Sequence, residues 1–261
     1  MKLHHLARAL PGPLIALITI ALLWHGPIAQ FQHYHDFADQ RGWGGLPHAA
    51  DVLSNLPFAL VGLWGLLRLW PLRQHGVLAR SWPAWLLFLL ALLATYAGSS
   101  WYHLAPDDHR LVWDRLPIAL ACAGLLAAVY AETQPVSAFA ALAALLGLTA
   151  FGVAGVAWWA QTADLRPYLL LQGMPLLLVP LWQWSSRSHA DLKAFGLALG
   201  CYVLAKAAEL TDMPILLATD MVSGHTLKHL LAALAAAIIV GRLIARAGTA
   251  EARGLGYPRP A

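Results

Sequence analysis

Residues 85–103 read WLLFLLALLATYAGSSWYH, a long apolar run that ends in two hydroxyls, an indole, a phenol and an imidazole. The run is apolar enough to lie inside a lipid bilayer. Burying polar groups in hydrocarbon is costly unless each one finds a partner, so polar clusters at this depth usually have a function. We therefore expect a membrane helix whose polar end meets partners from elsewhere in the chain.

The composition of the whole chain is that of a membrane protein. Of its 261 residues, 59% are hydrophobic and 11% are charged, and the mean hydropathy is +0.60; a soluble domain carries about 25% charged residues. The net charge of +4 is typical of basic cytoplasmic loops, so no nucleic-acid partner is expected. Cys122 and Cys201 lie in apolar runs, and we assign them neither a disulfide nor any chemistry.

Eight segments are long and apolar enough to cross a bilayer, which takes roughly 20 helical residues. They cover residues 12–30, 51–70, 82–104, 111–132, 136–160, 166–185, 191–211 and 224–245. The expected fold is therefore an all-α, polytopic transmembrane helix bundle. The first segment follows a basic start but lacks a clear cleavage site, so we expect a retained helix rather than a signal peptide.

The loop charges predict the orientation of these spans. Basic residues gather on the side that holds both termini, which is therefore expected to be cytoplasmic. That side collects 11 of the 17 basic residues, namely Lys2, Arg8, Arg68, Arg73, Arg80, Arg187, Lys193, Arg242, Arg246, Arg253 and Arg259. The opposite side collects 10 of the 13 acidic residues, namely Asp36, Asp39, Asp51, Asp107, Asp108, Asp114, Asp164, Glu209, Asp212 and Asp220. An acidic external face suits a cation.

Polar residues cluster at three helix ends on that external side. Ser99 and His103 are four residues apart and share a helix face, and so do His225 and His229. Asp114 lies about one turn inside the helix that follows His103. Two histidines on one helix and a third on another form a known catalytic zinc arrangement, whose fourth position is left to water.

Other interpretations of these histidines are open. A lone histidine in a membrane is more often a packed hydrogen-bonding residue, and an H-x-x-x-H pair binds metal in only a minority of matches. Haem is less favoured than zinc, because His225 and His229 project from one face and cannot both be axial ligands of one haem. Two other polar groups are expected to be structural, namely a Lys206–Glu209 ion pair and a solvated turn at 104–110.

The order and spacing of the motifs resemble the alkaline ceramidase family. These motifs are S-x-x-x-H at Ser99 and His103, an aspartate eleven residues on at Asp114, and H-x-x-x-H at His225 and His229. The ceramidases belong to a superfamily of seven-helix membrane hydrolases that includes the adiponectin/progestin-type receptors and GPI-lipid remodelling proteins.

The resemblance covers about residues 48–245, and DVLSNLPF at 51–58 resembles the start of the first core helix of the ceramidases. It implies four parts, a basic start with an extra helix (1–30), an external loop (31–50), a seven-helix zinc hydrolase core (51–245) and a disordered cytoplasmic tail (246–261). The chain would be a bacterial inner-membrane member with its zinc site toward the periplasm.

The resemblance also raises the question of calcium. Eukaryotic ceramidases carry an acidic calcium cluster around the external loop, and here Asp36, Asp39 and Asp51 form a candidate secondary cation site. The cluster lacks its glutamates, and His48 stands where the last one is expected. Calcium binding is therefore doubtful, and an ordinary external loop is an equal alternative.

The implied chemistry is the hydrolysis of an amide in ceramide or a related N-acyl lipid. His103, His225 and His229 would hold Zn²⁺, Asp114 would act as the general base, and Ser99 would steady the oxyanion. Two alternatives are an ester or other acyl-lipid hydrolase with the same site, and a non-catalytic receptor-like protein with structural zinc. The expected partner is a membrane lipid with one or two acyl chains.

Overall fold

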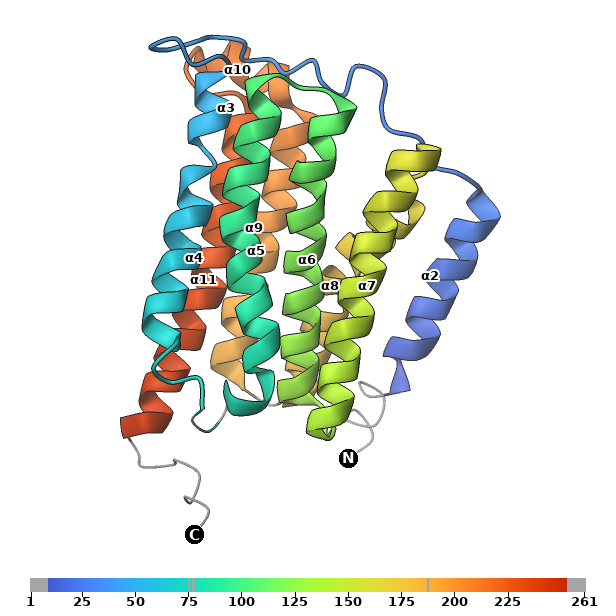
Figure 1. The fold of residues 1–261 in the computed structure, drawn as a ribbon, viewed down its shortest axis with the longest axis vertical. Helices are drawn as coiled ribbons and strands as arrows, with labels where there is room; N and C mark the ends of the chain where they lie inside the picture. Colours follow the sequence, from blue (N-terminus) through green and yellow to red (C-terminus); the bar gives the residue numbers. More distant parts are fainter. Residues whose placement is uncertain (1–8, 75, 77, 187, 253–261) are drawn as a thin grey trace.

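The computed structural model describes residues 9–74, 76, 78–186 and 188–252. Every regular element among them is a helix, as the sequence predicts (Figure 1). The helices are α2 (Pro11–His25), α3 (Ala49–Leu53), α4 (Leu56–Leu69), α5 (Leu78–Leu104), α6 (Asp108–Thr133), α7 (Ala138–Thr162), α8 (Arg166–Ser186), α9 (His189–Leu210), α10 (Asp212–Thr219) and α11 (Gly224–Ala252).

Each of the eight predicted segments falls on helix, but two details differ from the prediction. The first core segment is broken into α3 and α4, because Pro57 lacks the N–H that would bond back to the carbonyl of Leu53. An additional short helix, α10, follows α9 at a bend of 85°. Pro214 lies in its first turn and cannot bond back to Leu210, which favours the interruption.

Among the described residues, five helical stretches are long and apolar enough to cross a membrane, or six if α9 and α10 form one bent span. These helices indicate an integral membrane protein. α2 has only 15 residues and α8 is not among these stretches, so the count of eight spans remains a prediction. α11 continues past the expected end at 245, where Arg246 pairs with Glu132 at 2.7 Å. The basic start (1–8), Arg187 and the end of the tail (253–261) lie outside the described residues.

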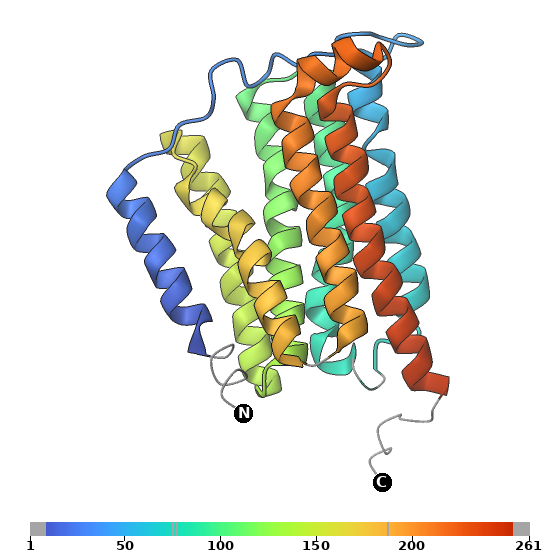
Figure 2. The same cartoon turned by 180° about the vertical axis from the view of Figure 1, so that it is seen from behind.

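The helices run side by side in one bundle, with α5 and α6 in its middle (Figures 1 and 2). α2 begins and α11 ends at the same end of the bundle, and α3 and α10 lie at the other. The segment 26–48 crosses that second end from α2 to α3. We call it the external segment, after the side on which the loop charges place it.

Two glycines allow α5 and α6 to approach closely. A Cβ on Gly98 would collide with the carbonyl oxygen of Trp113, and a Cβ on Gly124 would lie 2.9 Å from the carbonyl oxygen of Ala84. Small residues let helix backbones approach in membranes, where dispersion contacts and hydrogen bonds drive helix association. The contact at Gly98 places the end of α5, which carries Ser99, against the first turns of α6, which carry Asp114.

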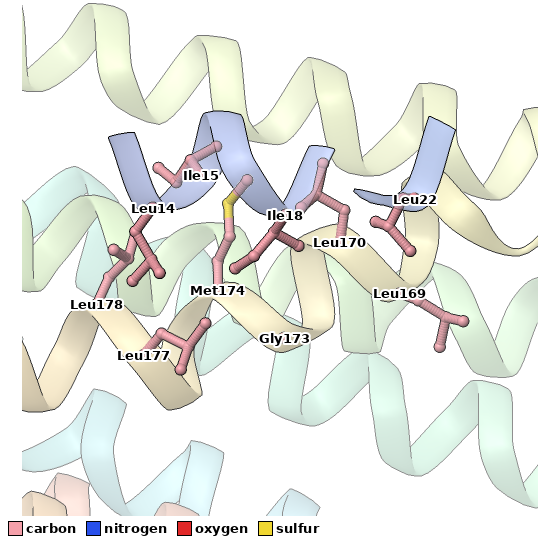
Figure 3. A pocket seen from close by; sticks show the side chains of 10 residues that line it. All are labelled: Leu14, Ile15, Ile18, Leu22, Leu169, Leu170, Gly173, Met174, Leu177 and Leu178. Carbon is pink, nitrogen blue, oxygen red and sulfur yellow. The ribbon is translucent and has the colours of Figure 1, made fainter. Parts of the chain in front are cut away.

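α2 is attached to the outside of this bundle. None of its residues is buried, and an apolar pocket of about 140 Å³ separates it from α8 (Figure 3). Aliphatic side chains of both helices line the pocket, among them Ile15, Ile18, Leu170 and Leu177. α2 therefore contributes no fully buried residue to the bundle, and its role as an extra helix before a seven-helix core remains a prediction.

Polar contacts hold the end of the external segment that follows α2. The backbone of Ile28 bonds to Leu165 (2.8 Å) and to the side chain of Asp164 (3.1 Å) in the turn before α8. Arg166 pairs with Asp164 at 2.8 Å and holds the pKa of that carboxyl well below its usual range. The segment therefore enters the external end of the bundle from a fixed point.

Candidate metal centre

The structure brings together the three histidines that the sequence singles out. His103 lies at the end of α5, and His225 and His229 lie in the first two turns of α11. All three are buried, and one ligand atom from each lies within 4.8 Å of the other two. The ring centroids are 4.7 to 5.0 Å apart. These three residues, which we call the histidine group, could hold a metal ion.

The hydrogen bonds around the histidine group are suited to metal binding. The Ser54 hydroxyl donates to the carbonyl oxygen of Asp51 (3.0 Å), so it accepts the Nδ1 proton of His229 at 2.8 Å. We therefore assign the lone pair of His229 to Nε2, which is the nitrogen that could bind a metal. In metal-binding histidines the ring nitrogen that does not bind the metal typically donates its proton to a neighbouring group, which fixes the tautomer in this way.

The other two histidines face one another through ring nitrogens. The Nε2 atoms of His103 and His225 are 3.3 Å apart, and the buried Nδ1 of His103 has no hydrogen-bond partner among the described residues. Two facing nitrogens can share one proton or bind one ion. A set of three neutral imidazoles fits Zn²⁺.

The beginning of α11 positions two of these ligands. One carboxylate oxygen of Asp212 accepts the backbone N–H of His225 at 2.7 Å, and the Ser223 hydroxyl accepts that of Thr226 at 3.0 Å. Both contacts satisfy N–H groups that have no partner within the helix. Asp212 also accepts the N–H of Ala38 at 2.9 Å, so the same carboxylate holds the external segment.

Asp114 lies where the beginning of α6 meets the end of α5, and Ser99 is about one helical turn before His103 on α5. Both side chains are buried, and the Ser99 hydroxyl interacts with the Asp114 carboxyl group. The close approach of α5 and α6 at Gly98 brings them together. Asp114 does not belong to the set of atoms within 4.8 Å of one another, so three side chains among the described residues could serve as protein ligands.

A charged cluster extends from α9 to the histidine group. The predicted pair of Lys206 and Glu209 is confirmed at 2.8 Å, and the second oxygen of Glu209 binds Lys228, also at 2.8 Å. The Lys228 ammonium group lies 3.5 Å from Nε2 of His225. Lys228 is thus a site residue that the motif analysis missed, although it directly precedes His229 in the sequence.

The external segment covers the histidine group. The ring centroid of Phe37 is 4.3 Å from that of His225 and 4.7 Å from that of His103. Nearby, His35 bonds through Nδ1 to the hydroxyl of buried Tyr102 at 2.8 Å. The segment is therefore an ordered cover, and no spacing in the sequence identified Phe37 as its contact with the site.

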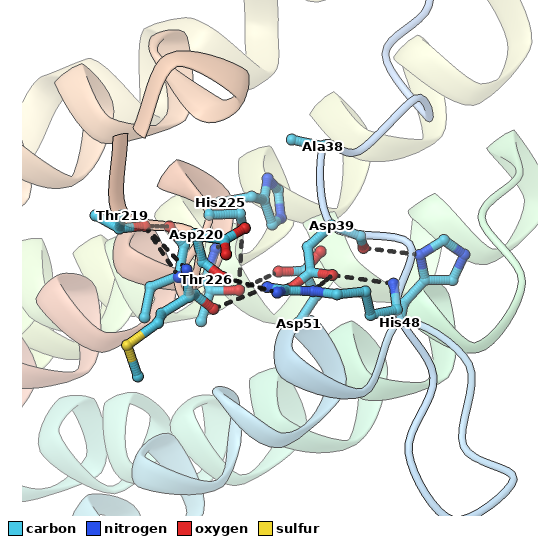
Figure 4. A network of polar contacts seen from close by, with 12 residues as sticks. Ala38, Asp39, His48, Asp51, Thr219, Asp220, His225 and Thr226 are labelled. Atoms are coloured by element: carbon cyan, nitrogen blue, oxygen red, sulfur yellow. Dashed lines mark hydrogen bonds and ion pairs between the residues drawn. The ribbon is translucent and has the colours of Figure 1, made fainter. Parts of the chain in front are cut away.

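The three aspartates of the candidate secondary cation site do not form a metal group in the part of the chain that the structure describes. Asp36 is exposed and contacts His33, 2.9 Å away. Asp51 is buried and accepts a hydrogen bond from Thr226 at 2.6 Å. Asp39 is bound by Arg41, whose guanidinium group lowers the pKa of this carboxyl (Figure 4).

Comparison of the chain with known protein-family models finds no match, and no curated protein sequence matches it. The site, more than the fold, therefore indicates the function, since one fold hosts many functions. The site consists of a buried histidine group, a carboxyl group with a hydroxyl beside it, and a cover of external segment.

Proposed function

We propose that the protein is a zinc-dependent hydrolase that cleaves the amide bond of ceramide or a related N-acyl lipid within the membrane. The single observation that carries the proposal is the buried histidine group, which lies at the end of long apolar helices. Among the described residues the group has three imidazoles and no fourth protein ligand, which favours a catalytic metal over a structural one that is closed by four ligands.

The residues around the histidine group would have different roles in the hydrolysis of an amide. His103, His225 and His229 would hold a zinc ion, which when bound would supply Lewis-acid chemistry toward water and a carbonyl group. Asp114 would take the proton of the attacking water and return it to the nitrogen of the leaving amine. The Ser99 hydroxyl, which lies near the Asp114 carboxyl group, would turn its one proton toward the developing oxyanion.

The surroundings of the site favour a lipid substrate. Long apolar helices lead up to the histidine group, and the ring of Phe37 covers it from the external side. Acyl chains would then lie along the helices while the polar head reaches the histidines. The excess of basic residues at the opposite end supports cytoplasmic termini and a site that faces the periplasm of a bacterial inner membrane.

The orientation predicts a labelling result. A cysteine introduced at Asp107, in the exposed turn after α5, should react with a membrane-impermeant maleimide in intact spheroplasts. One introduced at Arg73, in the turn after α4, should react only after the membrane is permeabilised. The opposite pattern would overturn the proposed orientation.

The substrate proposal is tested with the purified full chain in lipid nanodiscs. We expect it to release fatty acid and sphingoid base in equal amounts from an N-acyl sphingoid lipid, as measured by mass spectrometry, and to lose this activity with a zinc chelator. A zinc-loaded protein that cleaves only a matched acyl ester would instead be an ester hydrolase. A zinc-loaded protein that cleaves neither would be non-catalytic.

A further inference from the structure

Arg41 joins two segments that are far apart in the sequence. Its guanidinium group donates to both carboxylate oxygens of Asp39, each at 2.8 Å. It also donates to the carbonyl oxygens of Asp220 (3.0 Å) and Met221 (2.8 Å) in the turn between α10 and α11 (Figure 4). One side chain thus binds four oxygens and connects the external segment to the beginning of the ligand-bearing helix.

We propose that Arg41 is a positioning residue that closes the external segment over the histidine group, in place of a bound divalent cation. Two carboxylate oxygens and two backbone carbonyl oxygens are the kind of ligands that Ca²⁺ takes. Here a guanidinium group of the chain itself occupies the middle of this oxygen set. Closure of the external segment would therefore not depend on calcium.

The burial of Asp39 explains why a cation is needed at this place. Asp39 is 2% exposed, and a buried carboxylate is unfavourable without a partner of opposite charge. Arg41 keeps its side chain 54% exposed and still reaches both oxygens. Because Arg41 lowers the pKa of Asp39, the pair persists at neutral and mildly acidic pH and is lost as the pH falls through that lowered pKa.

The contacts on either side of Arg41 lead to the histidine group. On one side, two residues directly before Asp39 in the chain contact the site. The ring of Phe37 covers His225, and the N–H of Ala38 donates to Asp212. On the other side, the turn at Asp220 has a left-handed backbone (φ 54°) and leads into α11. The N–H of His225 in the first turn of α11 donates to Asp212 of α10. Release of Arg41 would loosen both the cover and the helix that presents two ligands.

Hydrogen exchange of the full chain in nanodiscs, followed by mass spectrometry, tests this proposal. In Arg41→Ala, peptides from the external segment around residues 36–49 should exchange about tenfold faster, because charged hydrogen bonds to two segments are lost. Arg41→Lys should restore protection in part, since an ammonium group cannot form the planar two-point contact. Arg73→Ala is the matched control, because Arg73 is a half-buried arginine at the other end of the bundle whose guanidinium group donates to the carbonyl oxygen of Trp70 at 2.7 Å.

Two further measurements distinguish closure by the Arg41 guanidinium group from closure by a bound calcium ion. Wild-type exchange should be the same in CaCl₂ and in a calcium chelator, and a low concentration of guanidinium chloride should protect Arg41→Ala better than NaCl of equal ionic strength. A calcium effect on the wild type, an Arg41→Ala variant that exchanges like Arg73→Ala, or equal effects of the two salts would overturn the proposal. Exchange is measured without substrate, so the outcome is independent of the proposed hydrolysis.

Discussion

His229→Ala is expected to remove both the bound zinc and the hydrolytic activity of the protein. The wild type should purify with about one zinc per chain, and the variant with much less, because two imidazoles and a water bind zinc far more weakly than three. Zinc content measured by mass spectrometry of the metal, together with fatty acid release, checks this expectation. The loss of activity should be complete within detection.

Two variants sharpen this prediction. Ser54→Ala keeps all three imidazoles but removes the acceptor that fixes the tautomer of His229, so zinc affinity should fall about 10- to 100-fold. His109→Ala is the matched control, because His109 is exposed on the same side of the bundle and outside the histidine group. Zinc content in His229→Ala equal to that of the control would refute the metal site.

Asp114→Asn should keep the zinc and lose most of the hydrolysis. The asparagine side chain has nearly the same shape and can still bond to Ser99, but it cannot accept a proton from water. The rate should therefore fall about 10²- to 10⁴-fold, the range for loss of a general base. Zinc content and turnover are measured on the same preparation.

The control for Asp114 is an isosteric change in the same helix. Asp107→Asn lies at the exposed beginning of α6, where its side chain accepts the N–H of Arg110, and asparagine is an equally good cap there. It should leave activity unchanged. Full activity in Asp114→Asn would remove Asp114 as the base, and loss of zinc in that variant would make it a ligand and favour the structural alternative.

The sequence by itself determined the helices and the core of the site. Runs of apolar residues predict membrane helices without reference to the rest of the chain, because their burial in lipid requires helical backbone hydrogen bonds. The four-residue spacings at Ser99 and His103 and at His225 and His229 place each pair on one helix face, which is a local property of the helix. The alternating direction of successive spans predicted that both pairs lie at the same end of the bundle.

Only the tertiary structure decided which residues support and cover that site. Ser54 bonds to His229, Arg41 to Asp220, and Phe37 packs on His225, although each pair is far apart in the sequence. Such contacts depend on how helices pack and where the external segment crosses the bundle, and no periodicity encodes them. The state of the candidate aspartates also depends on such contacts, because the carboxylate of Asp39 is paired with the side chain of Arg41.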